Sequence, residues 1–254
     1  MDANDDRVTR GYRRGAIGAD HVGSKRIGSD SIGRPVSPRG FRAASRNSDV
    51  DSNEVRHQWE TRSGEYSPAY YAHYGPDETS EMLRKTFERF LDPDAAIIEM
   101  GCSSGRHLAH LHEHGFERLS GIELNGDAFD VMAETYPDLA SEGTFHHGAI
   151  EDVIGEFADD RFDAVYSVET FQHIHPDAEW VFEEIARITS DVLITVENEG
   201  DGGVSRSAPT EVNYVTDDVP LYYRNWRHVF DGLGFAEVDA ERGNRDTVRT
   251  FRRT

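Results

Sequence analysis

Two glycines and a nearby acid form the part of the sequence that most clearly suggests chemistry. Residues 97–106 read IIEMGCSSGR, so Gly101 and Gly105 follow an apolar run and enclose three small residues. Glycines let a chain turn tightly and bring the backbone at a helix N-terminus close to a ligand. Glu99 precedes the first glycine by two positions. A carboxylate here would repel a diphosphate and attract a ligand that carries an ammonium group.

A dinucleotide site is the alternative for such a turn. Its pattern is G-x-G-x-x-G, but here Ser103 stands at the second glycine position and Arg106 at the third. A second acid, Glu123, follows Gly101 by 22 residues, near the roughly 20 expected for ribose recognition. An NAD-dependent oxidoreductase therefore stays open as an alternative, which the two substituted glycines disfavour.

The turn requires a strand before it and a helix after it, and the surrounding sequence alternates these two signals. We expect strands over residues 95–100, 119–124, 144–150, 162–168 and 192–198, and helices over residues 75–91, 107–114, 127–136, 151–157 and 177–188. Residues 222–235 read as a helix and a turn, and residues 235–241 and 247–253 as a closing antiparallel pair. Short links between the units predict an α/β fold, with a doubly wound, mostly parallel, seven-stranded sheet and helices on both faces.

These residues resemble class I S-adenosylmethionine-dependent methyltransferases over roughly residues 59–254. The first motif of that family, E/D-x-G-x-G-x-G, matches Glu99, Gly101 and Gly105, with Ser103 in place of the middle glycine. The resemblance implies a Rossmann-like methyltransferase fold and S-adenosyl-L-methionine as the cofactor. It also implies that the loop holds the methionyl end of this cofactor, with Glu99 near its amino group.

The resemblance implies further cofactor contacts along the chain. Glu123, at the end of its strand, takes the role of the acid that binds both ribose hydroxyls, and Leu124 follows it. Cys102 lies in the glycine loop, where we expect a small, buried packing residue next to the cofactor. It is the only cysteine of the chain, which excludes an internal disulfide and a thiolate-cluster metal site.

The third family motif falls on the stretch HGAIED. Ala149 occupies the position of the acid that faces adenine, and Ile150 lies beside the ring, so this resemblance leaves the contact to the amino group to Glu151 or Asp152.

The fourth motif matches FDAVYSVETFQHIHPD, in which the strand ends beside the reacting sulfonium. The resemblance then implies that Ser167, Val168 and Glu169 line the floor of the active site. His173 or Glu169 is a candidate general base for a hydroxyl acceptor, since an imidazole with a pKa near neutrality can take a proton. The alternative is that His173 is a structural histidine, and a carboxylate acceptor would need no base.

Two aromatic and basic segments are candidates for acceptor binding. Arg224 and Trp226, in LYYRNWRH, suggest a site for an anionic or sugar-like acceptor. The alternative is that this helix directs its arginines to surface acids. An aromatic run includes Tyr70, Tyr71 and Tyr74, which would form a lid over the cofactor or pack against the edge of the sheet.

A histidine-rich helix raises the question of a metal site. His107, His110 and His114 share one helical face. A zinc site is possible on spacing alone, but no H-E-x-x-H pattern is present. We therefore expect no bound metal.

The charge of the chain restricts its environment and partners. The sequence holds 48 acidic and 27 basic residues, and only Lys25 and Lys85 are lysines. This composition is typical of an extreme halophile, where molar salt shortens the Debye length to roughly 3 Å and screens self-repulsion. An ordinary acidic protein is the alternative. In either case we expect no nucleic-acid partner, because counterion release needs a positive face.

The organisation along the chain suggests one folded domain. Residues 1–55 hold 10 basic and 8 acidic residues without apolar periodicity, so we expect a disordered tail, and residues 56–254 form the methyltransferase domain. No apolar run approaches the roughly 18 residues of a membrane span. The start MDANDDRVTR also lacks an export signal, so a cytoplasmic protein is expected.

The expected function is methyl transfer from S-adenosylmethionine to a small-molecule acceptor. A uronic acid or another anionic metabolite is our guess at that acceptor, based on Arg224 and Trp226 alone. A protein that binds the cofactor without turnover is a further alternative. The sequence says nothing about the oligomeric state.

Overall fold

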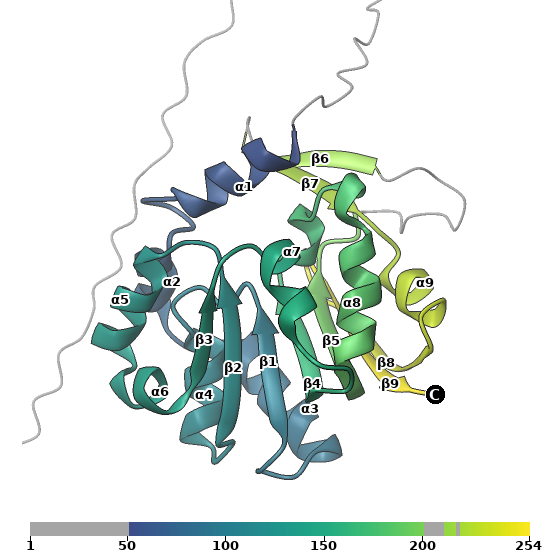
Figure 1. Ribbon diagram of the computed structural model, residues 1–254, viewed down its shortest axis with the longest axis horizontal. Helices are drawn as coiled ribbons and strands as arrows, with labels where there is room; N and C mark the ends of the chain where they lie inside the picture. The colour runs from purple at the N-terminus through teal and green to yellow at the C-terminus, as the bar shows by residue number, and fades with distance from the viewer. Residues whose placement is uncertain (1–50, 201–210, 217–218) are drawn as a thin grey trace, which may run out of the picture. The chain divides into compact units, whose positions relative to one another are not determined.

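A seven-stranded sheet with helices on both faces forms the centre of the protein (Figure 1). The computed structural model describes residues 51–200, 211–216 and 219–254. The strands lie in the order β3-β2-β1-β4-β5-β9-β8. Their bounds are β1 Ala96–Met100, β2 Arg118–Glu123, β3 Thr144–His147, β4 Phe162–Val168, β5 Thr189–Glu197, β8 Phe235–Arg242 and β9 Thr247–Arg253.

The direction of the strands confirms the fold expected from the sequence. Strands β1 to β5 pair in parallel, whereas β9 is antiparallel to both of its neighbours, β5 and β8. The order reverses at β1, which pairs with β2 on one side and with β4 on the other. Ligands of such sheets bind outside the carboxyl ends of the strands at this point.

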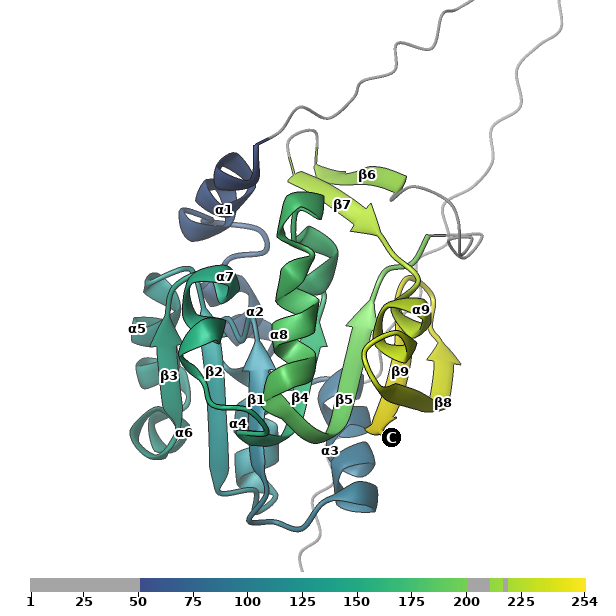
Figure 2. The same ribbon diagram turned by 45° about the vertical axis from the view of Figure 1, so that its right-hand side comes forward.

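Each face of the sheet is buried by its own helices. Alternate residues of β1 show this division, because Ile97 packs on one side and Ile98 on the other. The Ile97 side is covered by α3 Glu78–Phe90, α4 Arg106–Glu113, α5 Asp127–Thr135 and α6 Pro137–Glu142. The Ile98 side is covered by α7 Ile150–Val153, α8 Trp180–Ile188 and α9 Trp226–Asp231, of which α8 and α9 lie in front of the sheet in Figure 2.

The first helix of the described chain begins before the expected start of the folded domain. Helix α1 spans Ser52–Glu60, with Asp51 accepting a hydrogen bond from the amide of Asn53 at 3.0 Å. Val55 is buried at 3% exposure. Helix α1 therefore begins four residues before residue 56, where the folded domain was expected to start. Residues 1–50 of the expected tail lie outside the described residues.

A small second sheet was not expected. Strands β6 Glu211–Thr216 and β7 Val219–Tyr223 form an antiparallel pair. The predicted helix over residues 222–235 begins only at Trp226, after Asn225, whose side chain caps it. A further helix, α2 Pro68–Tyr74, occupies the aromatic run.

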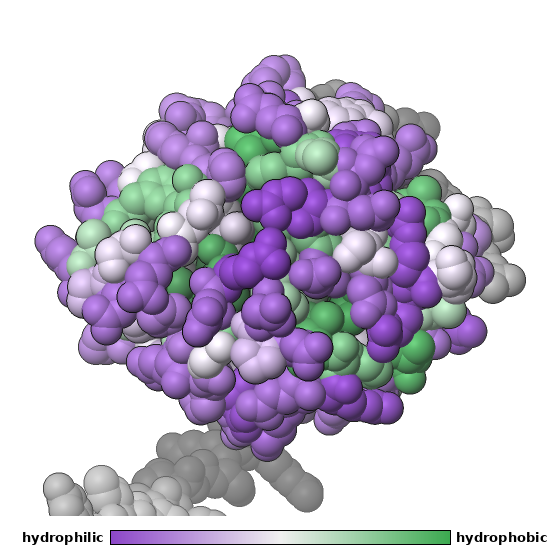
Figure 3. All heavy atoms as spheres, turned by 60° about the horizontal axis from the view of Figure 1, so that its bottom comes forward, coloured by the Kyte–Doolittle hydropathy of each residue, from purple (hydrophilic) through white to green (hydrophobic). Residues whose placement is uncertain are grey.

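One face of the molecule is mainly hydrophilic. The face shown in Figure 3 carries hydrophilic side chains with smaller, separate apolar areas. Within the described residues, no helix combines the length and the apolar character that crossing a membrane requires.

Candidate active site

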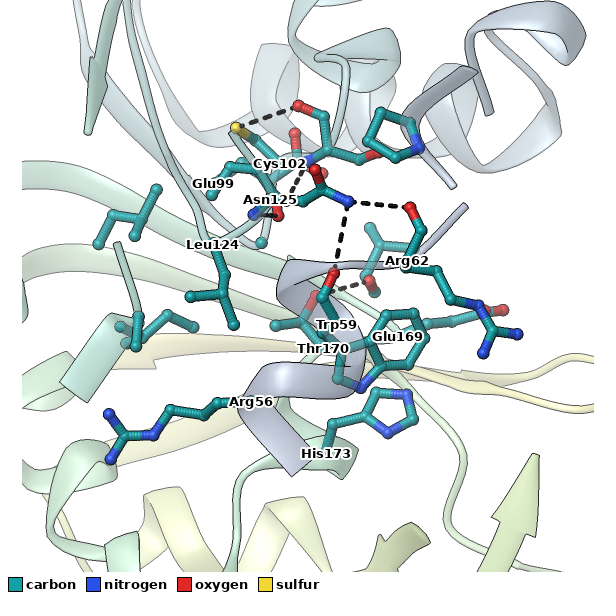
Figure 4. A pocket seen from close by; sticks show the side chains of 18 of the residues that line it. Arg56, Trp59, Arg62, Glu99, Cys102, Leu124, Asn125, Glu169, Thr170 and His173 are labelled. Atoms are coloured by element: carbon teal, nitrogen blue, oxygen red, sulfur yellow. Dashed lines mark hydrogen bonds between the residues drawn. The ribbon is translucent and has the colours of Figure 1, made fainter. Parts of the chain in front are cut away.

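A cavity of about 170 Å³ lies over the carboxyl ends of β1, β2 and β4. Its walls come from these strand ends, from the turns that follow them, and from α1 with the segment after it (Figure 4). Asn125 fixes this cover in place, since its side-chain amide donates hydrogen bonds to the carbonyls of Trp59 at 3.4 Å and Arg62 at 3.1 Å. Segments about 60 residues apart in the sequence thus enclose one space.

The turn after β1 has a backbone that only small residues allow. Gly101 has φ +73°, and a Cβ atom there would lie 2.3 Å from Oγ1 of Thr170. Ser103 also has a positive φ, 48°. Gly105 has φ +80° and a Cβ atom there would lie 3.0 Å from Met132 and from Leu139, so this second glycine packs against α5 and α6 and does not line the cavity.

The side chain between the two glycine positions is also packed closely. Cys102 is buried at 2% exposure. A Cβ atom on Gly121 of β2 would lie 2.5 Å from its sulfur. Cys102 also contributes to the wall of the cavity. Burial raises the pKa of its thiol well above the usual value, so the side chain stays a neutral thiol.

Glu99 is the buried acid of the cavity. It is 2% exposed, and the hydroxyl of Tyr166 donates a hydrogen bond to its Oε2 at 2.9 Å. Burial raises the pKa of Glu99 to about 8, and the charge of Glu123 acts in the same direction. Glu99 therefore carries a proton at pH 7 unless a cation lies beside it.

Glu123 lies at the end of β2 in the same cavity. Its two carboxylate oxygens accept hydrogen bonds from the backbone amides of Ser103 and Asn125, each at 2.7 Å. Burial raises its pKa, and these amides oppose the rise. Each oxygen keeps a second lone pair, so the carboxylate can accept two more hydrogen bonds.

The far end of the cavity is apolar with one ion pair. Leu124, Ala149 and Ile150 line it together. Glu151 also lines it and lies 3.6 Å from Arg56. The side chain of Asp152 is 69% exposed and pairs with Arg56 at 3.2 Å, so it points away from the cavity.

The segment after β4 brings both candidate bases to the cavity. Glu169 has φ +51° and pairs with Arg245. His173 donates from Nδ1 to the carbonyl of Pro220 at 3.0 Å, and its ring lies 4.6 Å from that of Trp59. Burial lowers the pKa of His173 to about 4. The imidazole is therefore neutral at pH 7, and its Nε2 keeps a lone pair.

Glu197, which the sequence analysis missed, holds this segment. It is fully buried at the end of β5 and accepts hydrogen bonds from the amides of Thr170 at 3.2 Å, Phe171 at 3.0 Å and Gln172 at 3.1 Å, and from Oγ of Ser167 at 2.5 Å. Burial raises the pKa of Glu197 to about 7. Ser167 was expected on the cavity floor, but the alternation of β4 turns it toward Glu197, and Val168 lines the cavity instead.

Two of the three predicted acceptor residues lie elsewhere. Arg224 is 4% exposed, pairs with Glu179 at 3.1 Å and donates to the carbonyl of Ile174 at 2.8 Å. Trp226 is fully buried in the core beside α8. Neither of these two residues, predicted to bind an acceptor, lines the cavity.

The aromatic run contributes one residue to the cavity. Tyr71 lines it, with the guanidinium of Arg106 5.0 Å from the ring centroid. Tyr74 is 63% exposed and so does not close over a ligand. Trp59 and Arg62 of the cover lie at the start of the same run, WETRSGEYSPAYYAHYGP, but the sequence analysis did not single them out.

The histidines of α4 are engaged in structural contacts. His107 is buried and hydrogen-bonds Oγ of Ser80 at 2.8 Å, and His110 lies 3.1 Å from Glu81. His114 bonds the carbonyl of His110 at 2.7 Å. No group of three metal-ligating side chains occurs within the ranges that the structure covers.

Comparison with known proteins relates the central part of the chain to a family of enzymes. Residues 97–191 match the family described as "Methyltransferase domain". A search of curated proteins found no match to the chain.

Solved structures with the same fold are numerous, and three illustrate the likeness. A 1,6-didemethyltoxoflavin-N1-methyltransferase from Burkholderia thailandensis, with bound S-adenosylhomocysteine, has 19% identity and a TM-score of 0.55 over 69% of this chain and 76% of its own. A putative sarcosine dimethylglycine methyltransferase from Galdieria sulphuraria has 15% identity and a TM-score of 0.55 over 68% and 84%. Magnesium protoporphyrin IX methyltransferase from Synechocystis PCC 6803, with bound S-adenosylmethionine, has 12% identity and a TM-score of 0.56 over 82% and 100%.

At these identities the structural likeness establishes the fold, and the family match adds the class of reaction. Residues 97–191 therefore match a methyltransferase domain, and the described chain has the fold of solved S-adenosylmethionine-dependent methyltransferases.

Proposed function

We propose that the enzyme transfers the methyl group of S-adenosylmethionine to a small-molecule acceptor held between α1 and the segment after β4. One observation carries this proposal: Glu99, Gly101 and Glu123 share a single covered cavity with His173. The cover formed by α1 leaves a confined space, which suits a small acceptor.

The residues of the cavity fit this cofactor, which supplies a methyl group already activated by a sulfonium. Glu99 would hold the amino group, and its raised pKa favours a cationic partner that restores its charge. The two unused lone pairs of Glu123 would accept the ribose hydroxyls. Leu124 and Ile150 provide an apolar place for adenine. The turn at Gly101 allows close approach because a side chain there would collide with Thr170.

The reaction is a displacement in which a lone pair of the acceptor attacks the methyl carbon and the carbon–sulfur electrons return to sulfur. The protein has to hold the acceptor roughly 3 Å from that carbon, in line and away from water. We assign the base for a hydroxyl acceptor to His173. Its Nδ1 proton is held by Pro220, so Nε2 can accept the hydroxyl proton. Glu169 is less suited, since Arg245 engages its carboxylate.

The working environment is a separate proposal. We propose that the enzyme acts in a cytoplasm of molar salt, because the acidic excess of 48 over 27 residues needs screening.

Two measurements test the methyltransferase proposal against its alternatives. Calorimetry in molar KCl should show binding of S-adenosylmethionine and S-adenosylhomocysteine but not of NAD; binding of NAD alone would identify an oxidoreductase. Incubation of a source-cell extract with cofactor labelled in its methyl group should then move label into small molecules. Cofactor binding without any transfer of label would indicate a non-catalytic binding protein.

A further inference from the structure

Arg62 presents an unused guanidinium to the cavity. It lies in the segment after α1, with its guanidinium carbon 5.7 Å from the ring centroid of Trp59 and 5.5 Å from that of Tyr66. Nε donates to the carbonyl of Glu65 at 3.0 Å. Neither terminal nitrogen of Arg62 has a hydrogen-bond or ion-pair partner among residues 51–200, 211–216 and 219–254. The two rings and one carbonyl therefore hold the guanidinium of Arg62 in place, while its two terminal nitrogens stay available to donate hydrogen bonds.

The other arginines at the cavity are already paired with carboxylates. Arg56 pairs with Asp152 at 3.2 Å and Arg106 with Asp77 at 2.9 Å. Arg245, at the edge of the site, pairs with Glu169. Of the three arginines that line the cavity, Arg62 is the one for which the described residues provide no carboxylate partner. A planar guanidinium group whose two terminal nitrogens are both available as donors is suited to bind a carboxylate in a bidentate manner.

The position of Arg62 assigns that carboxylate to the acceptor. Arg62 follows Trp59, whose ring contacts His173, and Figure 4 shows Arg56 and Arg62 extending in opposite directions from this segment. Burial is the main cause of the low pKa of His173, and the charge of Arg62 lowers it further. Arg106, in contrast, acts on Glu99, where it opposes the rise of the pKa that burial causes. Arg106 thus lies toward the cofactor acid and Arg62 toward the base.

We propose that Arg62 recognises the acceptor and that the acceptor is an acid, held by its carboxylate against the guanidinium that Trp59 and Tyr66 support. This inference rests on the proposed function of the same site. In this proposal Arg62 takes the place of Arg224, which is buried, as the residue that causes a preference for anionic acceptors.

The proposal restricts the atom that is methylated. A carboxylate bound by Arg62 keeps its charge, so the methyl group goes to a hydroxyl or an amine elsewhere on the acceptor. The lone pair of that oxygen or nitrogen forms the new bond to carbon, the electrons of the carbon–sulfur bond go to sulfur, and the released proton goes to Nε2 of His173 or to water. The product therefore keeps its carboxylate.

Binding to the complex with S-adenosylhomocysteine tests the recognition directly. We would titrate that complex by calorimetry with two acids and their uncharged counterparts, glucuronate against glucose and benzoate against benzamide. At least one acid should bind about tenfold more tightly than its counterpart, as expected for a charged hydrogen-bond partner. Arg62→Met should remove this preference, and Arg62→Lys should restore part of it. Arg227→Met is the matched control, since Arg227 is exposed on α9 and pairs with Glu237 at 3.5 Å.

The outcomes separate this proposal from the function on which it rests. Arg62→Met should leave the affinity for S-adenosylhomocysteine within about twofold, which also shows that the variant is folded. A large loss would assign Arg62 to the carboxylate of the cofactor and overturn the proposal, as would equal binding of acids and counterparts by the wild type. In the labelled extract, the product should be retained by an anion exchanger at about pH 11, where a methylated amine has lost its proton and the carboxylate leaves a net negative charge; label only in products that are neutral or cationic at this pH would also overturn it. A wild type that binds no S-adenosylhomocysteine would instead contradict the proposed function.

Discussion

The backbone amide of Ser103 donates a hydrogen bond of 2.7 Å to the carboxylate of Glu123. This contact joins the turn after β1 to the end of β2, so that the two parts of the proposed cofactor site hold each other in place. The carboxylate is thereby fixed before a ligand arrives, which lowers the entropy cost of binding.

Replacement of this acid should weaken the cofactor complex. Glu123→Ala removes the acceptor of both ribose hydroxyls, and hydrogen bonds to a charged group contribute about 1.5–3 kcal/mol each. We expect the dissociation constant for S-adenosylhomocysteine to rise at least about tenfold by calorimetry. Glu134→Ala, on the exposed side of α5, is the control. Undiminished affinity in Glu123→Ala would show that another acid binds the ribose.

A methyl group at the first glycine should abolish cofactor binding. Gly101→Ala places Cβ 2.3 Å from Oγ1 of Thr170, with φ at +73°. Gly115 is a matched control, because its φ is +91° and an added Cβ meets nothing within 4 Å. Gly115→Ala should cost about 1–2 kcal/mol of stability and keep full affinity. Thr170→Ala should partly rescue Gly101→Ala, since it removes the two nearest atoms. Full affinity in Gly101→Ala would contradict our assignment of the turn.

Cofactor binding should release a proton from Glu99. Its pKa is about 8 in the free protein, where burial disfavours the charge, and an adjacent ammonium lowers that pKa in the complex. Affinity should therefore rise with pH up to about 8. Calorimetry at pH 7 in buffers of different ionisation enthalpy should find more protons released by the wild type than by Glu99→Gln. Equal release would place the amino group elsewhere.

Glu99→Gln should affect the stability of the protein in the opposite direction to its effect on cofactor binding. A carboxyl whose folded pKa is raised stabilises the folded state fully below its unfolded pKa and loses that contribution as the pH rises through the folded value. The contribution of Glu99 to the stability of the wild type should thus fall as the pH rises from about 4.5 to about 8. Glu99→Gln should lose less stability over this range in thermal unfolding, although it binds the cofactor less well.

Salt should stabilise the enzyme. The net charge of −21 makes the folded chain repel itself, and raising KCl from 0.1 M to 1 M shortens the Debye length from about 10 Å to about 3 Å. We expect the midpoint of thermal unfolding to rise across this range. A midpoint that is independent of KCl would contradict the proposal of a molar-salt environment.

The fold was predictable because its signals are local. Strands such as β1 and β4 are buried on both faces and therefore read as short apolar runs. The acids Glu99 and Glu123 were predictable for the same reason, since each ends or nearly ends such a run. Helix α1 was missed because its stability comes from contacts with distant parts of the chain, such as the hydrogen bond from Asn125 to the carbonyl of Trp59.

The acceptor side of the site was less accessible from the sequence. An arginine near a tryptophan gives the same local pattern whether it faces a cavity or the core. Arg224 is buried against Glu179, while Arg62 lies beside Trp59 and has no carboxylate partner in the described part of the chain. Only the packing of α1 over the strand ends distinguishes them. Glu197 was missed because its role depends on amides that follow β4, some 25 residues earlier.

A crystal structure of the complex with S-adenosylhomocysteine tests the central claim most directly. We predict that both ribose hydroxyls donate hydrogen bonds to Glu123, at about 2.7 Å, and that the amino group lies beside Glu99. A nucleoside bound with its ribose away from Glu123 would contradict the account.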